Sequence, residues 1–447
     1  MIVNMTMNII DLLQELVSIN TINDPLRGIK PNIEAAKFIK DLLESWKIEV
    51  SLVESNGFYS VFGKIGKGSV RIMLLAHYDT VPVNPEEWKF DPFRLTIKDN
   101  KAYGRGALDD KSNVAALMLI LRELSKNNLK STVYFAFTGD EEIGGVNGAG
   151  VIANRLRDEK TLPSYLLNAD GHGMKVILRR RKAFNVIIKV PARKRVIRGR
   201  KEKRTFKPYF SASRHTHSAF FIAGADVHPL VAAASFIRDF EVMASKLEGK
   251  FLKSNVIPSE ITLEYVTSGE DEVEVDEGLT QLLTAIIPLT KLVFPTEKFS
   301  EFGITITPNM YTYRNETHVL TLDVRAMLRS GVVIRETIRK VLKEFLPTAK
   351  SRVIESKGNY LYTSQNSPIV IAFKNALEKL NEQFTTCESG GASDSRHFTI
   401  YGVDAVDFGP RGGNMHGPNE YVELSSLRKL PKIYLQVIRE IEHNCRN

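Results

Sequence analysis

Apolar residues recur along the first 170 residues with the two periods that separate helices from strands. Around residues 9–17 and 33–46 they repeat every three or four positions, which predicts two amphipathic helices. Shorter apolar runs, bounded by glycine or polar residues, predict strands, and a further helix is predicted at 113–124. The alternation of the two kinds of element predicts an α/β sheet with strands at 50–54, 58–63, 70–76, 133–138 and 165–168.

The pattern changes after residue 173, where longer strands of alternating polarity and basic segments replace the short strands and helices. Strands are predicted at 176–178, 184–190 and 319–327, and helices at 230–244 and 333–345. Such a combination is typical of an α+β layer. We therefore expect residues 174–357 to form a second domain that is inserted into the first.

From about residue 358 helices and strands alternate again, as they do in the first 170 residues. A helix is predicted at 369–380, a glycine-rich loop at 389–395, a strand at 405–408 and a final helix at 425–443. Residues 358–447 are therefore expected to complete the domain that residues 1–173 begin.

The composition fits a globular chain with more than one domain. The chain has 447 residues, a length that exceeds what one domain usually holds, and 43% of its residues are hydrophobic. No apolar run approaches the roughly 20 residues that a membrane helix needs, so we expect no membrane span. The chain has only two cysteines, Cys387 and Cys445, which argues against a disulfide framework and indicates a reducing, cytoplasmic location.

The positive charge of the chain is concentrated in one segment. Residues 175–207 contain fifteen lysines or arginines and one acid, Glu202, so this segment carries +14 while the whole chain carries +9 and the remainder −5. Within it, residues 193–204 have the charge density of an exposed loop. A solvated charged hairpin is the favoured interpretation, and steering of an anionic substrate or contact with nucleic acid are the alternatives.

Side chains that can bind metals follow the predicted strands of the first domain. The carboxyl ends of neighbouring strands meet at one edge of an α/β sheet, where such sheets build their sites, so these side chains are expected to converge. The candidates are His77 after strand 70–76, Asp109 before helix 113–124, Glu141 and Glu142 after strand 133–138, and Asp170 after strand 165–168.

Each candidate also has an interpretation without catalysis. By itself His77 would be a core histidine, Glu141 and Glu142 a solvated turn, and Asp109 part of a helix cap. Asp79 strengthens the functional interpretation, because a residue two positions after His77 in an extended segment returns to the same side. There it can accept a hydrogen bond from the imidazole and select the tautomer that binds a metal.

Five motifs in order give the chain a family resemblance. They are Leu-Leu-Ala-His-Tyr-Asp-Thr-Val-Pro at 74–82, Tyr-Gly-Arg-Gly-Ala-Leu-Asp-Asp-Lys at 103–111, Phe-Thr-Gly-Asp-Glu-Glu-Ile-Gly at 137–144, Gly-Gly-Ala-Ser-Asp-Ser-Arg at 390–396 and Asn-Met-His-Gly-Pro-Asn-Glu-Tyr at 414–421. The chain resembles the M20 metallopeptidases, which include dipeptidases, carboxypeptidases, aminoacylases and succinyl-diaminopimelate desuccinylase. The resemblance implies a mixed-sheet catalytic domain like that of the zinc exopeptidases, with an inserted α+β, ferredoxin-like lid domain.

The resemblance also implies a two-metal site. His77 and Asp170 would hold the first ion, Glu142 and His416 the second, and Asp109 would bridge them, with a cis peptide bond after Asp109. Imidazole and carboxylate ligands suit zinc, with cobalt or manganese as alternatives. Glu141 would be the general base for the attacking water.

Within the inserted domain, the resemblance implies substrate contacts. His217 would stabilise the oxyanion, with His215 as the second choice, and lid domains of this kind often pair in a homodimer. Asn309 and Arg325, together with Arg396 of the glycine-rich loop, would bind a substrate carboxylate. Residues 194–207 and 247–295 make this lid longer than is usual in the family.

These observations predict a metal-dependent hydrolase that cleaves an amide bond in a dipeptide, a short peptide or an N-acyl amino acid. Asp at position 170 and Asp-Asp-Lys at 109–111 resemble the dipeptidase members more than the deacylases. The alternative is a biosynthetic deacylase of the succinyl-diaminopimelate desuccinylase or acetylornithine deacetylase type. A nucleic-acid-binding protein that uses residues 175–207 is the remote alternative.

Overall fold

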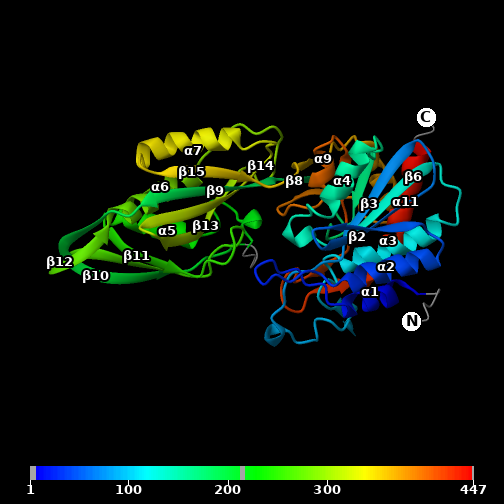
Figure 1. Ribbon diagram of the computed structural model, residues 1–447, viewed down its shortest axis with the longest axis horizontal. Coiled ribbons are helices and arrows are strands. Elements are labelled where there is room, and N and C mark those ends of the chain that lie inside the picture. The colour runs from blue at the N-terminus through cyan, green and yellow to red at the C-terminus, as the bar shows by residue number, and fades with distance from the viewer. Residues whose placement is uncertain (1–6, 212–216, 445–447) are drawn as a thin grey trace. The chain divides into compact units, whose positions relative to one another are not determined.

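The chain divides into two compact units, each described here by itself. The computed structural model describes residues 7–211 and 217–444. Unit 1 comprises residues 1–180, 357–389 and 393–447, and unit 2 comprises residues 181–356 and 390–392. Unit 1 therefore contains both the N-terminal blue elements and the C-terminal red helix of Figure 1. The borders inferred above, at 173/174 and 357/358, stay predictions about separate folding domains.

Unit 1 is built on a mixed nine-stranded sheet, which confirms the predicted α/β class. Its order is β1-β2-β6-β3-β7-β18-β8-β16, with β17 paired to β8. The pairs β6–β3, β3–β7 and β7–β18 are parallel, so the carboxyl ends of these four strands lie at the same edge. The strands are β1 (Val50–Ser55), β2 (Phe58–Ile65), β3 (Val70–His77), β6 (Ser131–Thr138), β7 (Tyr165–Asn168), β8 (Val176–Arg180), β16 (Leu361–Tyr362), β17 (Thr386–Ser389) and β18 (Asp404–Asp407).

Helices cover both faces of the sheet, and side chains that alternate along each strand pack against them. Ile72 and Leu74 of β3 pack with the main helical layer, whereas Met73 and Leu75 pack with α4 on the other face. The main layer consists of α1 (Ile9–Ser18), α2 (Ile33–Ser45), α3 (Lys111–Leu124), α8 (Pro368–Lys379) and α11 (Leu430–Asn444), while α4 (Ala149–Asp158) and the short α9 (Arg396–Thr399) complete the second.

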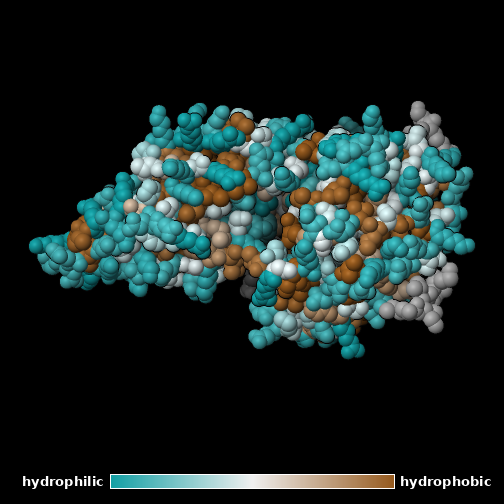
Figure 2. All heavy atoms as spheres, viewed as in Figure 1, coloured by the Kyte–Doolittle hydropathy of each residue, from teal (hydrophilic) through white to brown (hydrophobic). Residues whose placement is uncertain are grey.

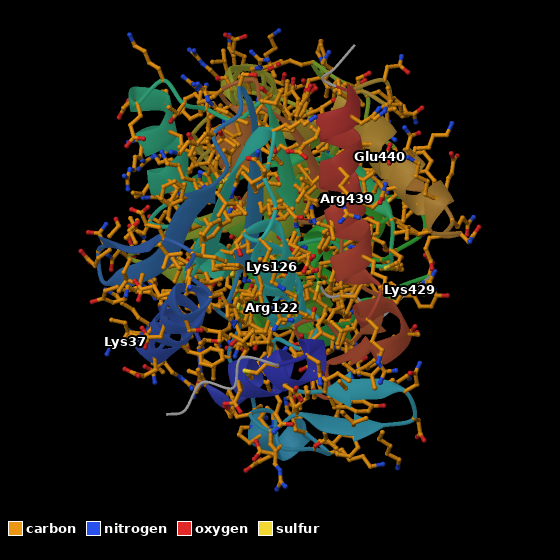
Figure 3. All side chains as sticks on the ribbon, turned by 90° about the vertical axis from the view of Figure 1, so that its right-hand side faces the viewer. Lys37, Arg122, Lys126, Lys429, Arg439 and Glu440 are labelled. Atoms are coloured by element: carbon orange, nitrogen blue, oxygen red, sulfur yellow. The ribbon has the colours of Figure 1, made fainter. Side chains whose placement is uncertain are left out.

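The helix α11 shows why these helices bury only one face. Its apolar residues Ile433, Val437 and Ile441 are buried, whereas Arg439, labelled in Figure 3, is exposed. Glu440 accepts a hydrogen bond of 2.6 Å from Lys379 at the end of α8, which ties the two helices together.

A small second sheet in unit 1 orders the loops near the predicted site. Its order is β19-β20-β5-β4, and it joins the segment before Asp109 to the segment after His416. Its strands are β4 (Thr96–Lys98), β5 (Lys101–Tyr103), β19 (Gly412–Gly413) and β20 (Tyr421–Glu423).

Unit 2 has a core of its own, formed by an antiparallel sheet and three helices. The sheet order is β13-β14-β9-β15, and buried side chains of this sheet pack against all three helices. The strands are β9 (Lys182–Pro191), β13 (Thr305–Arg314), β14 (Thr317–Ala326) and β15 (Lys350–Glu355), and the helices are α5 (Pro229–Asp239), α6 (Glu277–Thr290) and α7 (Val332–Phe345).

The prediction of an exposed loop at 193–204 is wrong, because these residues form a long strand. β10 (Lys194–Phe206) pairs with β12 (Ile261–Asp276), which pairs with β11 (Met243–Gly249). The basic side chains of β10 face acids across the pair, as in Lys194–Glu274 at 3.0 Å and Lys203–Glu264 at 2.9 Å. Figure 2 shows a mostly hydrophilic surface over these three strands. Acids of the same sheet therefore balance much of the positive charge of β10.

Two helix predictions also need correction. The helix expected at 230–244 ends at Asp239, and β11 begins at Met243. The helix expected at 425–443 is two helices, α10 (Leu424–Leu427) and α11. Pro431 lies in the first turn of α11, where its missing N–H costs no helical hydrogen bond, so it favours the start of a new helix there. No helix among the described residues is long and apolar enough to cross a bilayer.

Candidate metal centre

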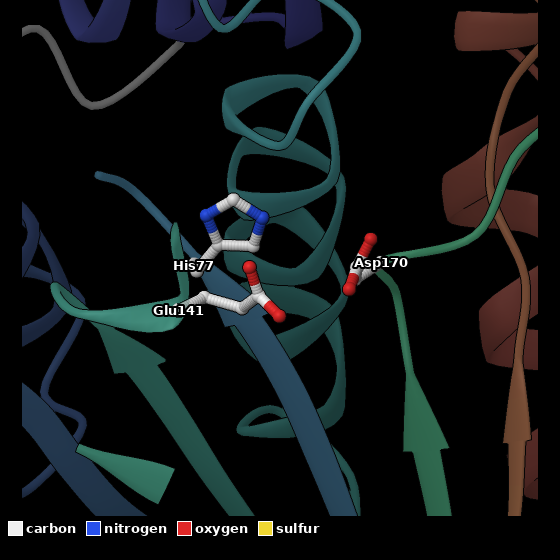
Figure 4. Close-up of side chains that lie close together, drawn as sticks. All are labelled: His77, Glu141 and Asp170. Carbon is white, nitrogen blue, oxygen red and sulfur yellow. The ribbon is translucent and has the colours of Figure 1, made fainter. Parts of the chain in front are cut away.

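All five predicted ligands meet in unit 1. Together with Glu141, the predicted base, they form two clusters, His77–Glu141–Asp170 and Asp109–Glu142–His416, and in each cluster the candidate ligand atoms lie within 4.8 Å of one another. In Figure 4 the Glu141 carboxylate lies between the His77 ring and Asp170. The cluster forms because β3, β6 and β7 end at one sheet edge, where the pairing of His77 with Thr138 brings the following turn close.

Asp109 connects the two clusters. One carboxylate oxygen, Oδ1, lies 3.0 Å from His77 Nε2, and the other, Oδ2, lies 2.8 Å from His416 Nε2. The peptide bond between Asp109 and Asp110 is cis, as the family resemblance implied. Each oxygen of one carboxylate thus faces a different cluster, which is the geometry that a bridging ligand needs.

Asp79 organises both the imidazole and the glutamate turn. Its Oδ1 lies 3.3 Å from His77 Nδ1, and its two oxygens accept backbone hydrogen bonds from Glu141 and Glu142 at 3.1 and 3.2 Å. Asn23 donates a further bond of 2.9 Å to Oδ2. A proton held on His77 Nδ1 leaves Nε2, which faces Asp109, as the ligand atom.

The electrostatics of the clusters favour cations. Burial would lower the pKa of His77, but the carboxylates of Asp109 and Asp79 raise it well above its ordinary value. Burial raises the pKa of Asp170 well above its usual range. Burial also raises the pKa of Glu141 to about 7, although His77 and Arg396 oppose the shift. Carboxylates held this closely in a buried site are stabilised when positive charge is added.

The donor set fits divalent metal ions. Glu142 Oε1 is buried and accepts no hydrogen bond from the described residues, although His416 Nε2 lies 3.3 Å away. Nitrogen and carboxylate oxygen donors without cysteine match open catalytic zinc sites rather than closed structural ones. The residues present are therefore suitable for holding two such ions.

Glu420 is a functional candidate that the sequence interpretation missed. It is completely buried, and its carboxylate accepts bonds from Arg105 at 2.5 Å and from the backbone N–H groups of Leu108 and Asp109 at 2.8 and 3.0 Å. The acid therefore holds the loop that presents Asp109. Its position four residues after His416 in the last motif was the available signal.

We expect Glu420→Gln to weaken both the fold and metal binding. Arg105 would stay buried without its counter-charge, so the free energy of unfolding of the metal-free protein should fall by about 3–5 kcal/mol. Metal affinity should fall by about 10–100-fold, because the Asp109 loop is less firmly held. Urea denaturation and calorimetric zinc titration measure the two effects.

The control is Glu382→Gln, which removes the partner of the half-exposed Lys429 in the same unit. It should change the free energy of unfolding by less than about 1 kcal/mol. Equal effects of the two variants would contradict the role of Glu420.

Arg396 is the one substrate-binding candidate in unit 1, and the structure brings it beside Glu141. Its Nη2 lies 3.9 Å from Glu141 Oε1 and 3.7 Å from Asp394 Oδ1. The side chain is only 12% exposed. A guanidinium in this position can bind a carboxylate or tune the charge of Glu141.

In unit 2, His217 is held in one orientation. Its Nδ1 accepts a hydrogen bond of 3.1 Å from the backbone N–H of Ala219, so the neutral ring carries its proton on Nε2. The side-chain amide nitrogen of Asn255, which is itself a donor, lies 3.1 Å from Nε2. With its proton on Nε2, the ring can donate a hydrogen bond to an oxyanion only after this amide turns or moves away. His215, the second choice, lies outside the described residues.

The other two candidates in unit 2 are engaged within the unit. Asn309 is completely buried, donates to the Ser254 carbonyl at 2.6 Å and lies 3.1 Å from His228 Nε2, so a contact with substrate would require these bonds to break. Arg325 Nε donates to Asp323 at 2.9 Å. Asp323 also accepts a bond from Ser218, the neighbour of His217, and so joins Arg325 to the His217 turn.

Known proteins resemble this chain in sequence and in fold. Succinyl-diaminopimelate desuccinylase of Nautilia profundicola is 24% identical over 444 residues, covering 97% of this chain and 100% of that protein. An M20 family metallo-carboxypeptidase from Sulfolobus solfataricus shares the fold with a TM-score of 0.64 at 19% identity, covering 98% of this chain and 100% of the other. Aminoacylhistidine dipeptidase from Vibrio alginolyticus gives a TM-score of 0.69 at 15% identity, covering 96% of both chains.

The family assignment comes from the match along the chain. The model of peptidase family M20/M25/M40 matches residues 73–440, a range that includes His77, Asp109, Glu142, Asp170 and His416. The resemblance that the five motifs carried is thereby confirmed. The chain belongs to peptidase family M20/M25/M40.

Proposed function

We propose that this member of the family is a two-metal hydrolase that cleaves an amide bond close to a free carboxylate, in a dipeptide, a short peptide or an N-acyl amino acid. The observation that carries the proposal is the position of the Asp109 carboxylate, with one oxygen toward His77 and the other toward His416. Two clusters that share a carboxylate are what a pair of catalytic ions requires.

The proposed ligands follow the two clusters. His77 and Asp170 hold the first ion, Glu142 and His416 the second, and Asp109 bridges them. Zinc is the proposed metal, with cobalt and manganese as substitutes that accept the same donors. When bound, the ions lower the pKa of a water molecule and polarise the substrate carbonyl.

The chain's own residues then move the proton and bind the substrate. Glu141, which lies between His77 and Asp170, accepts a proton from the attacking water and passes it to the leaving nitrogen. His217 donates its Nε2–H to the oxyanion. Arg325 or Arg396 binds the free carboxylate of the substrate, and Asn309 remains a weaker candidate because both ends of its amide are engaged.

A substrate panel tests the proposal. Zinc-loaded protein is offered dipeptides, N-acetyl and N-succinyl amino acids, and the matching carboxamides, and release of the amine is measured. We expect hydrolysis of at least one class and a large loss for its carboxamides, which lack the charge that an arginine binds. No amine release from any class, by protein that binds zinc, would contradict the proposal.

The deacylase is the second candidate, and the sequence relatives favour it. The desuccinylase relative matches this chain along its whole length. Preference for N-succinyl or N-acetyl amino acids over dipeptides in the panel would select it. The remote nucleic-acid interpretation loses support because acids of β12 face the basic strand β10. A homodimer and a cytoplasmic location stay part of the proposal, the latter because the chain has only two cysteines.

The pH dependence of kcat/KM should report Glu141. The group must be ionised to accept a proton, and burial raises its pKa to about 7. As the pH falls through the pKa the base is protonated, so kcat/KM should decrease on the acid side. Nearby metal ions favour the carboxylate and move this limb below pH 7. A kcat/KM that keeps rising as the pH falls below about 5 would contradict the assignment.

A further inference from the structure

A buried ion pair lies outside the proposed ligand set, at the ends of two strands of unit 1. Arg180 ends β8 and Asp407 ends β18, and they are 6% and 0% exposed. Arg180 Nε donates to Asp407 Oδ2. No step of the proposed reaction uses either side chain, and removing one partner of a buried pair leaves an uncompensated charge.

Arg180 connects this pair to a proposed ligand. Its Nη2 donates a hydrogen bond of 2.7 Å to the backbone carbonyl of Asp170. Asp170 lies just beyond the end of the short strand β7. The planar guanidinium contacts Asp407 through Nε and Asp170 through Nη2, whereas a lysine would have to reach both acceptors from a single nitrogen. A buried cation therefore holds the backbone of Asp170, whose side chain is the proposed metal ligand.

Asp407 connects the same pair to the glycine-rich loop. It accepts hydrogen bonds from Ser393 Oγ at 2.7 Å and from Ser395 Oγ at 2.5 Å. The next residue after Ser395 is Arg396, whose Nη2 lies 3.9 Å from Glu141. One carboxylate thus holds Arg180 together with Ser393 and Ser395 of the loop that presents Arg396.

The sign of the charges explains why the two residues occur together. A fixed guanidinium near Asp170 would oppose a divalent cation at that site if its charge were not balanced. Asp407 supplies the balancing charge through its ion pair with Arg180. Arg180 can therefore orient Asp170 without reducing the affinity for the metal.

We propose that Arg180 and Asp407 are positioning residues for the first metal site, in which Arg180 fixes Asp170 through its carbonyl and Asp407 holds Arg180 and balances its charge. This inference rests on the proposed function, because it concerns the same ion. A merely structural pair would instead join β8 to β18, which are paired at Ile177 and Asp407. The two roles differ in their effect on metal binding.

The experiment is a calorimetric titration of zinc into metal-free protein, with the free energy of unfolding measured in parallel. Wild-type protein should bind two ions. Asp407→Asn should weaken one of the two binding events by about 10–100-fold and leave the other largely unchanged. The double variant Arg180→Met/Asp407→Asn should recover part of this loss, because no unbalanced cation remains beside Asp170.

Two further variants keep the test decisive. Asp404→Asn is the matched control, because Asp404 begins the same strand and accepts a bond of 2.6 Å from Ser367; both zinc affinities should stay at the wild-type level. Arg180→Lys keeps the charge but loses the guanidinium that reaches both Asp170 and Asp407, and it should weaken the same event as Asp407→Asn. It provides the test if Asp407→Asn does not fold.

Three outcomes separate this inference from the function on which it rests. Two-ion binding by the wild type, with one event weakened in Asp407→Asn and Arg180→Lys, supports it. Two-ion binding with wild-type affinities in those variants, even if they unfold more easily, overturns the inference and leaves the proposed function intact. A wild-type protein that binds no zinc overturns both.

Discussion

Replacing Glu141 by glutamine should lower kcat by a factor of about 10²–10⁴ while both metal ions stay bound. Glutamine keeps the size of the side chain and cannot accept the proton of the attacking water. The variant also decides between two roles, because Glu141 lies close enough to His77 and Asp170 to be a ligand itself. Steady-state kinetics and elemental analysis of the dialysed protein measure turnover and metal content.

Glu440→Gln is the control for this variant. Glu440 is a buried glutamate of the same unit that pairs with Lys379 and lies on α11, so its loss should leave kcat unchanged. A Glu141→Gln protein with wild-type kcat would contradict the role as base. Loss of one metal ion together with activity would instead make Glu141 a ligand.

The second large effect is expected for Asp109→Ala, which should lose both ions and with them all measurable turnover. The Asp109 carboxylate faces both clusters, and without it the two imidazoles lose the partner between them. Removing a group that merely supports a ligand costs about 10–100-fold in affinity, so loss of the shared ligand itself should exceed that for each ion. Zinc content after dialysis against a weak chelator measures the effect.

Asp24→Asn is the matched control, since Asp24 and Asp109 are both 8% exposed. It should retain two ions. An Asp109→Ala protein that keeps two ions would contradict the bridging role. Retention of one ion would mean that the clusters bind independently.

The ligands could be predicted from the sequence because each depends on a local signal. His77, Glu142 and Asp170 each follow an apolar strand, and the parallel pairing of β3, β6 and β7 then brings them together. Asp109 and His416 have weaker local signals, and the order of the five motifs identified them. In unit 1, strand periodicity thus predicted where the candidates converge, and the family resemblance implied which of them are ligands.

What the sequence could not reveal depends on contacts between distant segments. Glu420 acts on a loop more than 300 positions earlier, and its place in the last motif does not reveal the contacts with that loop. The high charge density of β10 is typical of an exposed loop when its sequence is taken alone. Its pairing with the acidic strand β12 is a contact between distant segments. Asn309 was assigned to the substrate from its motif position, and its burial against Ser254 and His228 emerges only in three dimensions.

The most direct test of the two-metal account is anomalous X-ray diffraction from crystals of the zinc-loaded protein, collected on both sides of the zinc absorption edge. The account predicts two peaks, one beside His77 and Asp170, the other beside Glu142 and His416, with the Asp109 carboxylate contacting both. A single peak, or peaks bound by other residues, would contradict it.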